Sequence, residues 1–186
     1  MNWPNRITVL RILLVPVLVA VALRVPAHPG LLRVFLALVF VSAFTDALDG
    51  AVARLTGQRT PLGGILDPLA DKMFLAACTV LLACPLWPWE GAGPAPRLPE
   101  WVAVVIVSRD LFLGLGSAVI YLQTGRLRAP PRVVGKITTV LQMALVAGAL
   151  LPRLPAAVLD LLAAGAVAAT LGSWALYLYD GARQLR

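Results

Sequence analysis

Two short stretches place four aspartates in a chain that is otherwise largely apolar: DALDGAVAR at residues 46–54 and GGILDPLAD at residues 63–71. Asp46 and Asp49 are i,i+3 neighbours, and Asp67 and Asp71 are i,i+4 neighbours, so on a helix each pair lies on one face. A carboxylate in or near a bilayer costs about 3 kcal/mol unless another charge offsets it. Because hard oxygen ligands suit Mg²⁺, Mn²⁺ or Ca²⁺, the pattern predicts a site for divalent metal.

The composition indicates an all-α integral membrane protein. Of the 186 residues, 60% are hydrophobic and 13% are charged, whereas a soluble domain carries about 25% charged residues. The apolar runs are long enough to predict six transmembrane helices in a single membrane domain, residues 1–186. We expect these helices at residues 7–25, 31–55, 64–84, 100–122, 133–151 and 156–179.

Lysine and arginine predict the orientation of these helices, since cytoplasmic loops carry an excess of both. If the N-terminus is inside, basic residues such as Arg54, Arg132 and Lys136 fall at cytoplasmic ends, and both termini are cytoplasmic. The net charge of +7 is then explained by anionic lipid headgroups, and we expect no nucleic-acid partner.

This topology brings the four aspartates to one depth, just beneath the cytoplasmic surface. The link between the second and third helices is short, which predicts that they are antiparallel neighbours whose carboxylate faces meet. Gly50 and Ala53 leave space beside the carboxylates, and Arg54 is positioned to hold phosphate. Four carboxylates, open space and a cation together describe a site for two metal ions and a diphosphate.

The two stretches match D-x-x-D-G-x-x-A-R followed by G-x-x-x-D-x-x-x-D. This is the signature of the CDP-alcohol phosphotransferase family, which the chain resembles over its whole length. The resemblance implies the six-helix fold of that family, a location in the cell inner membrane and an active site on the cytoplasmic side. It also implies transfer of a phosphatidyl group from CDP-diacylglycerol to an alcohol, with release of CMP.

The resemblance further implies a role for each matching residue. Asp46, Asp49, Asp67 and Asp71 would hold two Mg²⁺ or Mn²⁺ ions, with Ca²⁺ as an inhibitory occupant. Asp71 would also be the general base that takes the proton of the acceptor hydroxyl. The residues that would bind CDP-diacylglycerol are Asn5, Thr8, Gly50, Ala53, Arg54 and Gly63.

Three further segments are similar to the bacterial branch of this family that makes anionic phospholipids. They are PNRITVLR at residues 4–11, LDPLADK at 66–72 and GKITTVLQ at 135–142, which resemble P-N-x-x-T-x-x-R, L-D-P-x-A-D-K and G-K-x-x-T-x-x-Q. This branch contains phosphatidylglycerophosphate synthases and cardiolipin synthases. We expect glycerol-3-phosphate as the acceptor, held through its phosphate by Arg109, Arg132 and Lys136.

Several alternatives are open at this point. The triplet Ser108-Arg109-Asp110 is more similar to the cardiolipin-synthase type, for which phosphatidylglycerol is the acceptor. Arg109 and Asp110 could also form a purely structural ion pair. Intramembrane acids mark ion pathways as well, so a metal-ion transporter is the competing class, and an intramembrane aspartyl protease is a third. The resemblance implies a homodimer, and it assigns no role to Arg126 and Arg128.

Overall fold

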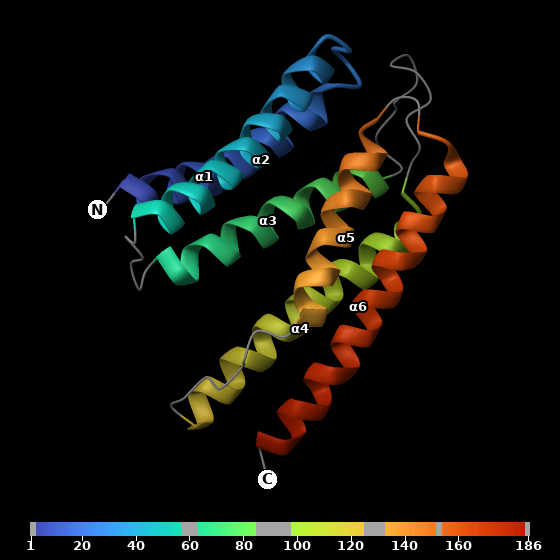
Figure 1. The fold of residues 1–186 in the computed structure, drawn as a ribbon. Coiled ribbons are helices and arrows are strands. Elements are labelled where there is room, and N and C mark those ends of the chain that lie inside the picture. Colours follow the sequence, from blue (N-terminus) through green and yellow to red (C-terminus); the bar gives the residue numbers. More distant parts are fainter. Residues whose placement is uncertain (1–2, 57–62, 85–97, 125–132, 152–153, 185–186) are drawn as a thin grey trace. The chain divides into compact units, whose positions relative to one another are not determined.

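The computed structural model describes residues 3–56, 63–84, 98–124, 133–151 and 154–184; within these helices some side chains, including those of 3–7, 46–56, 63–66 and 180–184, are not described. All regular structure in this part of the chain is α-helical (Figure 1). The six helices are α1 (Trp3–Arg24), α2 (Leu31–Thr56), α3 (Gly63–Ala83), α4 (Glu100–Thr124), α5 (Val133–Ala149) and α6 (Ala156–Gln184).

The predicted helices are therefore all present, and the differences lie at their ends. Helix α1 begins at Trp3 rather than at residue 7, because Pro4 fits the first turn of a helix. Helix α5 ends at Ala149, since the residue before Pro152 avoids helical backbone angles. Helix α6 runs to Gln184, past the expected end at 179, because its polar tail contains good helix formers.

Residues Met1–Ala95 form one compact unit, in which α1 packs against both α2 and α3. The turn after Arg24 joins α1 and α2 into a helical hairpin (Figure 1). We expected α2 and α3 to be direct neighbours, but the extensive contacts among the described residues are those that α1 makes with each of them. The link between α2 and α3, residues 57–62, lies outside the described residues.

One face of α1 is buried from Thr8 to the end of the helix. Its members alternate spacings of three and four residues, which is the spacing of a packed helical seam. The buried residues are Thr8, Arg11, Val15, Leu18, Ala22 and, directly after the helix, Val25. Four of these are apolar, so the seam is polar only where it begins, at Thr8 and Arg11.

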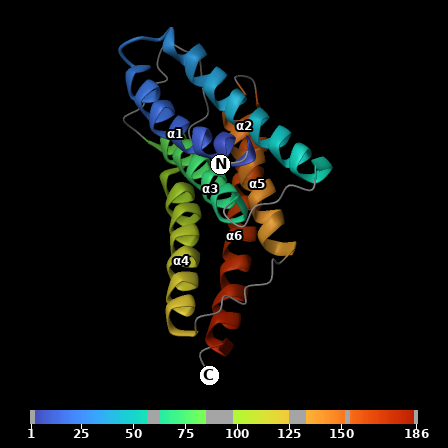
Figure 2. The ribbon, with the colours of Figure 1, turned by 90° about the vertical axis from the view of Figure 1, so that its left-hand side faces the viewer.

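Residues Pro96–Arg186 form the second compact unit, in which α6 packs against both α4 and α5. Within this unit α4 and α6 run side by side (Figure 2). The buried face of α6 again alternates spacings of four and three: Leu159, Ala163, Ala166, Thr170 and Ser173. Phe112 and Trp174 stack between α4 and α6 with ring centroids 5.5 Å apart. This seam therefore turns polar at Thr170 and Ser173, toward the end of the chain.

By length and composition, one helical stretch among the described residues could cross a membrane, Ala156–Tyr179 in α6. Shorter apolar stretches occur at Leu31–Thr45 in α2 and Val134–Ala149 in α5. Exposed leucine, valine and phenylalanine side chains are frequent on most of the helices. Such surfaces suit a lipid environment better than water.

Candidate functional site

Two polar contacts join α1 to the motif carboxylates of α3. The hydroxyl of Thr8 donates a hydrogen bond to Asp67, with 2.5 Å between Oγ1 and Oδ1. The guanidinium of Arg11 forms an ion pair with Asp71, with 2.9 Å between Nη1 and Oδ1. Because residue numbers rise in the same direction along both helices, α1 and α3 run parallel at this contact.

The helical periods of the two stretches explain why both contacts form at once. Thr8 and Arg11 are three residues apart on α1, and Asp67 and Asp71 are four apart on α3, so each pair shares one face of its helix. Ala70 is buried between the two aspartates and allows the helices to approach closely. The N-terminal motif and the third-helix motif are therefore two sides of one site.

The donors and acceptors of this site differ in their exposure to solvent. Thr8 is 1% exposed and Arg11 is 2% exposed, whereas Asp67 is exposed and the side chain of Asp71 is 34% exposed. The carboxylates are thus held from the core side and keep contact with the surroundings on their outer side. Both are oxygen ligands of the type that Mg²⁺ and Mn²⁺ prefer.

The structure places the other motif residues only by their backbone. Asp46, Asp49, Gly50, Ala53 and Arg54 lie in the last turns of α2. Gly63 is the first residue of α3, and Asn5 lies in the first turns of α1. The side chains of these residues lie outside the described set. Their predicted roles in binding metal and CDP-diacylglycerol therefore stay predictions.

Among the described side chains, no three histidine, cysteine, aspartate or glutamate residues lie close enough together to hold a metal ion. Asp67 and Asp71 are the two described members of the predicted four-carboxylate set. A two-metal site would need the carboxylates of Asp46 and Asp49 as well. The two described carboxylates have the chemistry that a divalent cation prefers, and α1 contacts both of them from one side.

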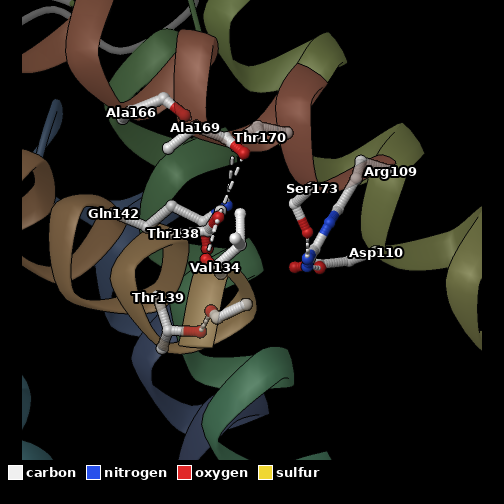
Figure 3. Close-up of polar contacts among 11 residues, drawn as sticks. Arg109, Asp110, Val134, Thr138, Thr139, Gln142, Ala166, Ala169, Thr170 and Ser173 are labelled. Atoms are coloured by element: carbon white, nitrogen blue, oxygen red, sulfur yellow. Dashed lines mark hydrogen bonds and ion pairs between the residues drawn. The ribbon is translucent and has the colours of Figure 1, made fainter. Parts of the chain in front are cut away.

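A second polar cluster lies between α4 and α6 and contains Arg109, one of the predicted acceptor ligands. Figure 3 shows its guanidinium between Asp110 and Ser173: Nη1 is 2.6 Å from Asp110 Oδ1 and Nη2 is 2.5 Å from Ser173 Oγ. The Cζ atom of Arg109 also lies 6.0 Å from the centroid of the Tyr177 ring, within the range of a cation–π interaction.

Arg109 is only 4% exposed, so it requires these partners to offset the loss of hydration. The ion pair with Asp110 is the structural arrangement that the sequence left open as an alternative. Arg109 Nε is buried and has no hydrogen-bond partner among the described residues. Acceptor binding by Arg109 stays a prediction, because two of its three nitrogens are already engaged within the protein.

The GKITTVLQ segment of α5 contains residues that face α6 and residues that are exposed. Thr138 donates to the carbonyl of Ala169 at 3.1 Å, and the amide of Gln142 lies 3.4 Å from the hydroxyl of Thr170 (Figure 3). A Cβ atom on Gly135 would lie 3.2 Å from Tyr177 Oη, which is a tight contact. The glycine, threonine and glutamine of this segment therefore serve the α5–α6 contact.

Lys136 is exposed in the first turn of α5, away from the contact with α6. The amide groups of a helix N-terminus together with a lysine favour anions, which agrees with the predicted role in binding acceptor phosphate. Arg132, Arg126 and Arg128 lie outside the described residues. Of the three predicted acceptor ligands, Lys136 is thus the one that the structure shows accessible.

Sequence reasoning identified Arg11 only as a member of the N-terminal motif and did not predict its contact with Asp71. The signal was present in the spacing, because Thr8 and Arg11 continue the three-and-four pattern of the buried residues of α1. A charged residue in such a pattern requires a buried or half-buried partner. The sequence does not say which of the acidic residues is that partner, since 60 positions separate Arg11 from Asp71.

Comparison with known proteins agrees with the resemblance drawn from the motifs. The family model described as CDP-alcohol phosphatidyltransferase matches residues 1–177. This range includes all four aspartates, the N-terminal motif and the GKITTVLQ segment. The match therefore covers both compact units rather than the aspartate motif alone.

Several relatives also match. A Bacillus subtilis (strain 168) protein named CDP-diacylglycerol--glycerol-3-phosphate 3-phosphatidyltransferase is 33% identical over 165 residues, which cover 83% of this chain and 79% of that protein. A Pseudomonas fluorescens protein of the same name is 44% identical over 82 residues, covering 44% and 41%. A Mycobacterium tuberculosis (strain ATCC 25618 / H37Rv) protein provisionally named as a cardiolipin synthase is 28% identical, covering 73% of this chain and 58% of that protein.

Proposed function

Because the chain belongs to the CDP-alcohol phosphatidyltransferase family, we propose that it transfers the phosphatidyl group of CDP-diacylglycerol to glycerol-3-phosphate. The acceptor hydroxyl oxygen bonds to the phosphorus that carries diacylglycerol, and the bond from that phosphorus to the CMP oxygen breaks. The products are phosphatidylglycerophosphate and CMP. The observation that carries this proposal is the paired carboxylates of Asp67 and Asp71, held by α1 within a chain that matches the family over residues 1–177.

In this proposal the residues of the site have distinct tasks. Asp46, Asp49, Asp67 and Asp71 hold two divalent ions, Mg²⁺ or Mn²⁺, which supply neutralising charge for the diphosphate and the leaving group. Asp71 accepts the proton of the acceptor hydroxyl. Arg54 holds the diphosphate, and Gly50, Ala53 and Gly63 leave room for the nucleotide. Asn5 completes the CDP-diacylglycerol site at the start of α1, and Thr8 contributes to it through its hydrogen bond to Asp67.

We assign glycerol-3-phosphate as acceptor for two reasons. Two relatives are named CDP-diacylglycerol--glycerol-3-phosphate 3-phosphatidyltransferase; one matches most of this chain and the other matches part of it. In addition, Lys136 is exposed at the N-terminus of α5, where a soluble phosphorylated acceptor could be bound. Arg132, four residues earlier, would add a second cation, while Arg109 stays committed to Asp110 and Ser173.

The proposal includes a membrane setting. All six helices cross the membrane, with both termini and the aspartate motif on the cytoplasmic side. The two compact units are halves of one domain, residues 1–186, because the family match extends across both. The excess of basic residues at the predicted cytoplasmic ends supports this orientation, and the enzyme acts as a homodimer with lipid around it.

The test uses the purified full-length protein in detergent with CDP-diacylglycerol, labelled glycerol-3-phosphate and Mg²⁺ or Mn²⁺. We expect labelled phosphatidylglycerophosphate and an equal amount of CMP, with neither formed in excess EDTA. A parallel reaction replaces glycerol-3-phosphate by phosphatidylglycerol. Formation of cardiolipin in that reaction, with no product from glycerol-3-phosphate, would replace our acceptor assignment by the cardiolipin-synthase activity.

A further inference from the structure

We propose that Thr8 and Arg11 are positioning residues that orient the metal-binding carboxylates of Asp67 and Asp71. Helix α1 fixes one oxygen of each carboxylate from the core side, so that the outer side of each is presented to the divalent ion. This inference rests on the proposed function, because the metal ion belongs to it. The positioning of the carboxylates is a role of α1 in addition to its proposed role in binding CDP-diacylglycerol.

The contacts from α1 reach the two carboxylates from their buried side. Thr8 and Arg11 are almost completely buried, whereas Asp67 and Asp71 retain exposed surface. A cation that approaches from outside the unit therefore meets the carboxylates on the side that α1 does not occupy. The buried hydroxyl and guanidinium leave this approach open.

The contacts from α1 also restrict the motion of the two carboxylates. A free aspartate samples several side-chain rotamers, and fixing them costs free energy when a ligand binds. Here the two contacts lie one helical turn apart on both helices and continue directly into the apolar seam at Val15 and Leu18. The orientation of the carboxylates is therefore determined when the protein folds, before a metal ion arrives.

Thr8 and Arg11 differ in charge, and this difference separates their roles. Thr8 is neutral, so its hydrogen bond orients Asp67 without changing the charge of the site. Arg11 both orients Asp71 and places a positive charge beside it, which offsets the carboxylate in a region of low polarity. A substitution of Thr8 consequently changes only the orientation of Asp67. Arg11→Lys keeps the positive charge and changes only the orientation of Asp71.

The experiment measures Mn²⁺ binding to the purified full-length protein by electron paramagnetic resonance, without nucleotide or acceptor. Loss of an outer partner of a metal ligand typically weakens binding about 10–100-fold, and we expect this for Thr8→Val. Thr8→Ser keeps the hydroxyl and should bind Mn²⁺ within about threefold of the parent. Arg11→Lys keeps the charge but loses the planar geometry, so we expect binding weakened about 10-fold.

The matched control is Thr79→Val. Thr79 is also a 1% exposed threonine, on α3, but its hydroxyl donates to the carbonyl of Leu75 in its own helix. This variant should lose thermal stability comparably to Thr8→Val and keep its Mn²⁺ affinity. If Thr79→Val weakens Mn²⁺ binding as much as Thr8→Val, the effect comes from general packing and the proposal is wrong.

The same measurements distinguish failure of this inference from failure of the proposed function. If the parent makes phosphatidylglycerophosphate but Thr8→Val and Arg11→Lys bind Mn²⁺ like the parent while folded, α1 does not position the carboxylates. If the parent binds Mn²⁺ and the variants bind it weakly, but no product forms from CDP-diacylglycerol, the positioning role holds and the assigned reaction is wrong. Thermal unfolding in EDTA verifies that each variant is folded.

Discussion

The guanidinium of Arg11 lies 2.9 Å from the carboxylate of Asp71, although 60 residues separate them in the chain. This ion pair joins the N-terminal motif to the last aspartate of the family signature. It means that Asp71 has a packing partner on α1 in addition to its proposed role as general base and metal ligand. Substitutions at Asp71 must therefore be chosen so that the contact with Arg11 survives.

Asp71→Asn meets this condition, because an amide oxygen can still accept a hydrogen bond from Arg11. It should reduce turnover about 10²–10⁴-fold, since asparagine cannot take the proton of the acceptor hydroxyl. CMP release from CDP-diacylglycerol measures the effect. Asp160→Asn, at an exposed aspartate of α6, is the control and should retain the parent rate. Turnover of Asp71→Asn within a few-fold of the parent would remove Asp71 from the mechanism.

The sequence was sufficient to predict the helices and insufficient to predict how they pair. Apolar runs and prolines determine where helices end, and the bounds of α2, α3 and α4 agree with the sequence to within about two residues. Packing partners depend on side-chain fit, which periodicity does not encode. For this reason the sequence did not show that α1 contacts both α2 and α3.

The sequence also predicted one part of the candidate site and not another. Motif spacing indicated that Asp67 and Asp71 share one face of a helix, and the structure confirms this through their contacts with Thr8 and Arg11. The sequence could not show that Arg109 is buried, because its partner Ser173 lies 64 residues away. The presence of a cation in a motif therefore does not establish that the cation is available to a substrate.

The Arg109–Asp110 ion pair leads to a prediction about stability. The side chains are 5% and 14% exposed, so Asp110→Asn leaves a buried charge without its counter-ion and should cost about 3–5 kcal/mol of unfolding free energy. Ser173→Ala removes one neutral partner of Arg109 and should cost about 1–3 kcal/mol. Denaturant unfolding in detergent measures both.

The double variant Arg109→Met/Asp110→Asn provides the comparison. Because it removes the cation together with its partner, it should be more stable than Asp110→Asn alone. If the double variant is the less stable of the two, the ion pair with Asp110 is not what makes Arg109 tolerable in this position, and the cost of Asp110→Asn has another source.

Gly135 and Tyr177 are coupled across the α5–α6 contact. An added Cβ at Gly135 would meet Tyr177 Oη at 3.2 Å, so Gly135→Ala should lower stability, although alanine normally improves a helix by about 0.5–1 kcal/mol over glycine. In a Tyr177→Phe background the hydroxyl is absent, and the same substitution should become neutral or stabilising. Thermal unfolding of the four proteins measures this coupling.

Gly172→Ala is the reference for this cycle, since a Cβ atom there meets nothing within 4 Å. It should raise the unfolding temperature with either residue at position 177. An equal effect of Gly135→Ala in the tyrosine and phenylalanine backgrounds would contradict the coupling. The hydroxyl of Tyr177 would then not be the reason for glycine at the start of the GKITTVLQ segment.

The last prediction concerns the acceptor. Lys136 is exposed at the N-terminus of α5, and a charged hydrogen bond to phosphate contributes about 1.5–3 kcal/mol. Lys136→Ala should therefore raise KM for glycerol-3-phosphate about 10–100-fold. It should leave KM for CDP-diacylglycerol within about threefold of the parent, because in our proposal the aspartate motif and Arg54 bind that substrate. Steady-state rates with each substrate varied in turn measure both constants.

Arg33→Ala is the control for a general loss of positive charge. Arg33 is an exposed cation near the start of α2, far along that helix from the aspartate motif, and its removal should change neither KM. If Lys136→Ala raises both KM values equally, Lys136 acts on the site as a whole and not on the acceptor phosphate. If it changes neither, while glycerol-3-phosphate is still converted, the acceptor phosphate is held elsewhere, and Arg132 is the next residue to substitute.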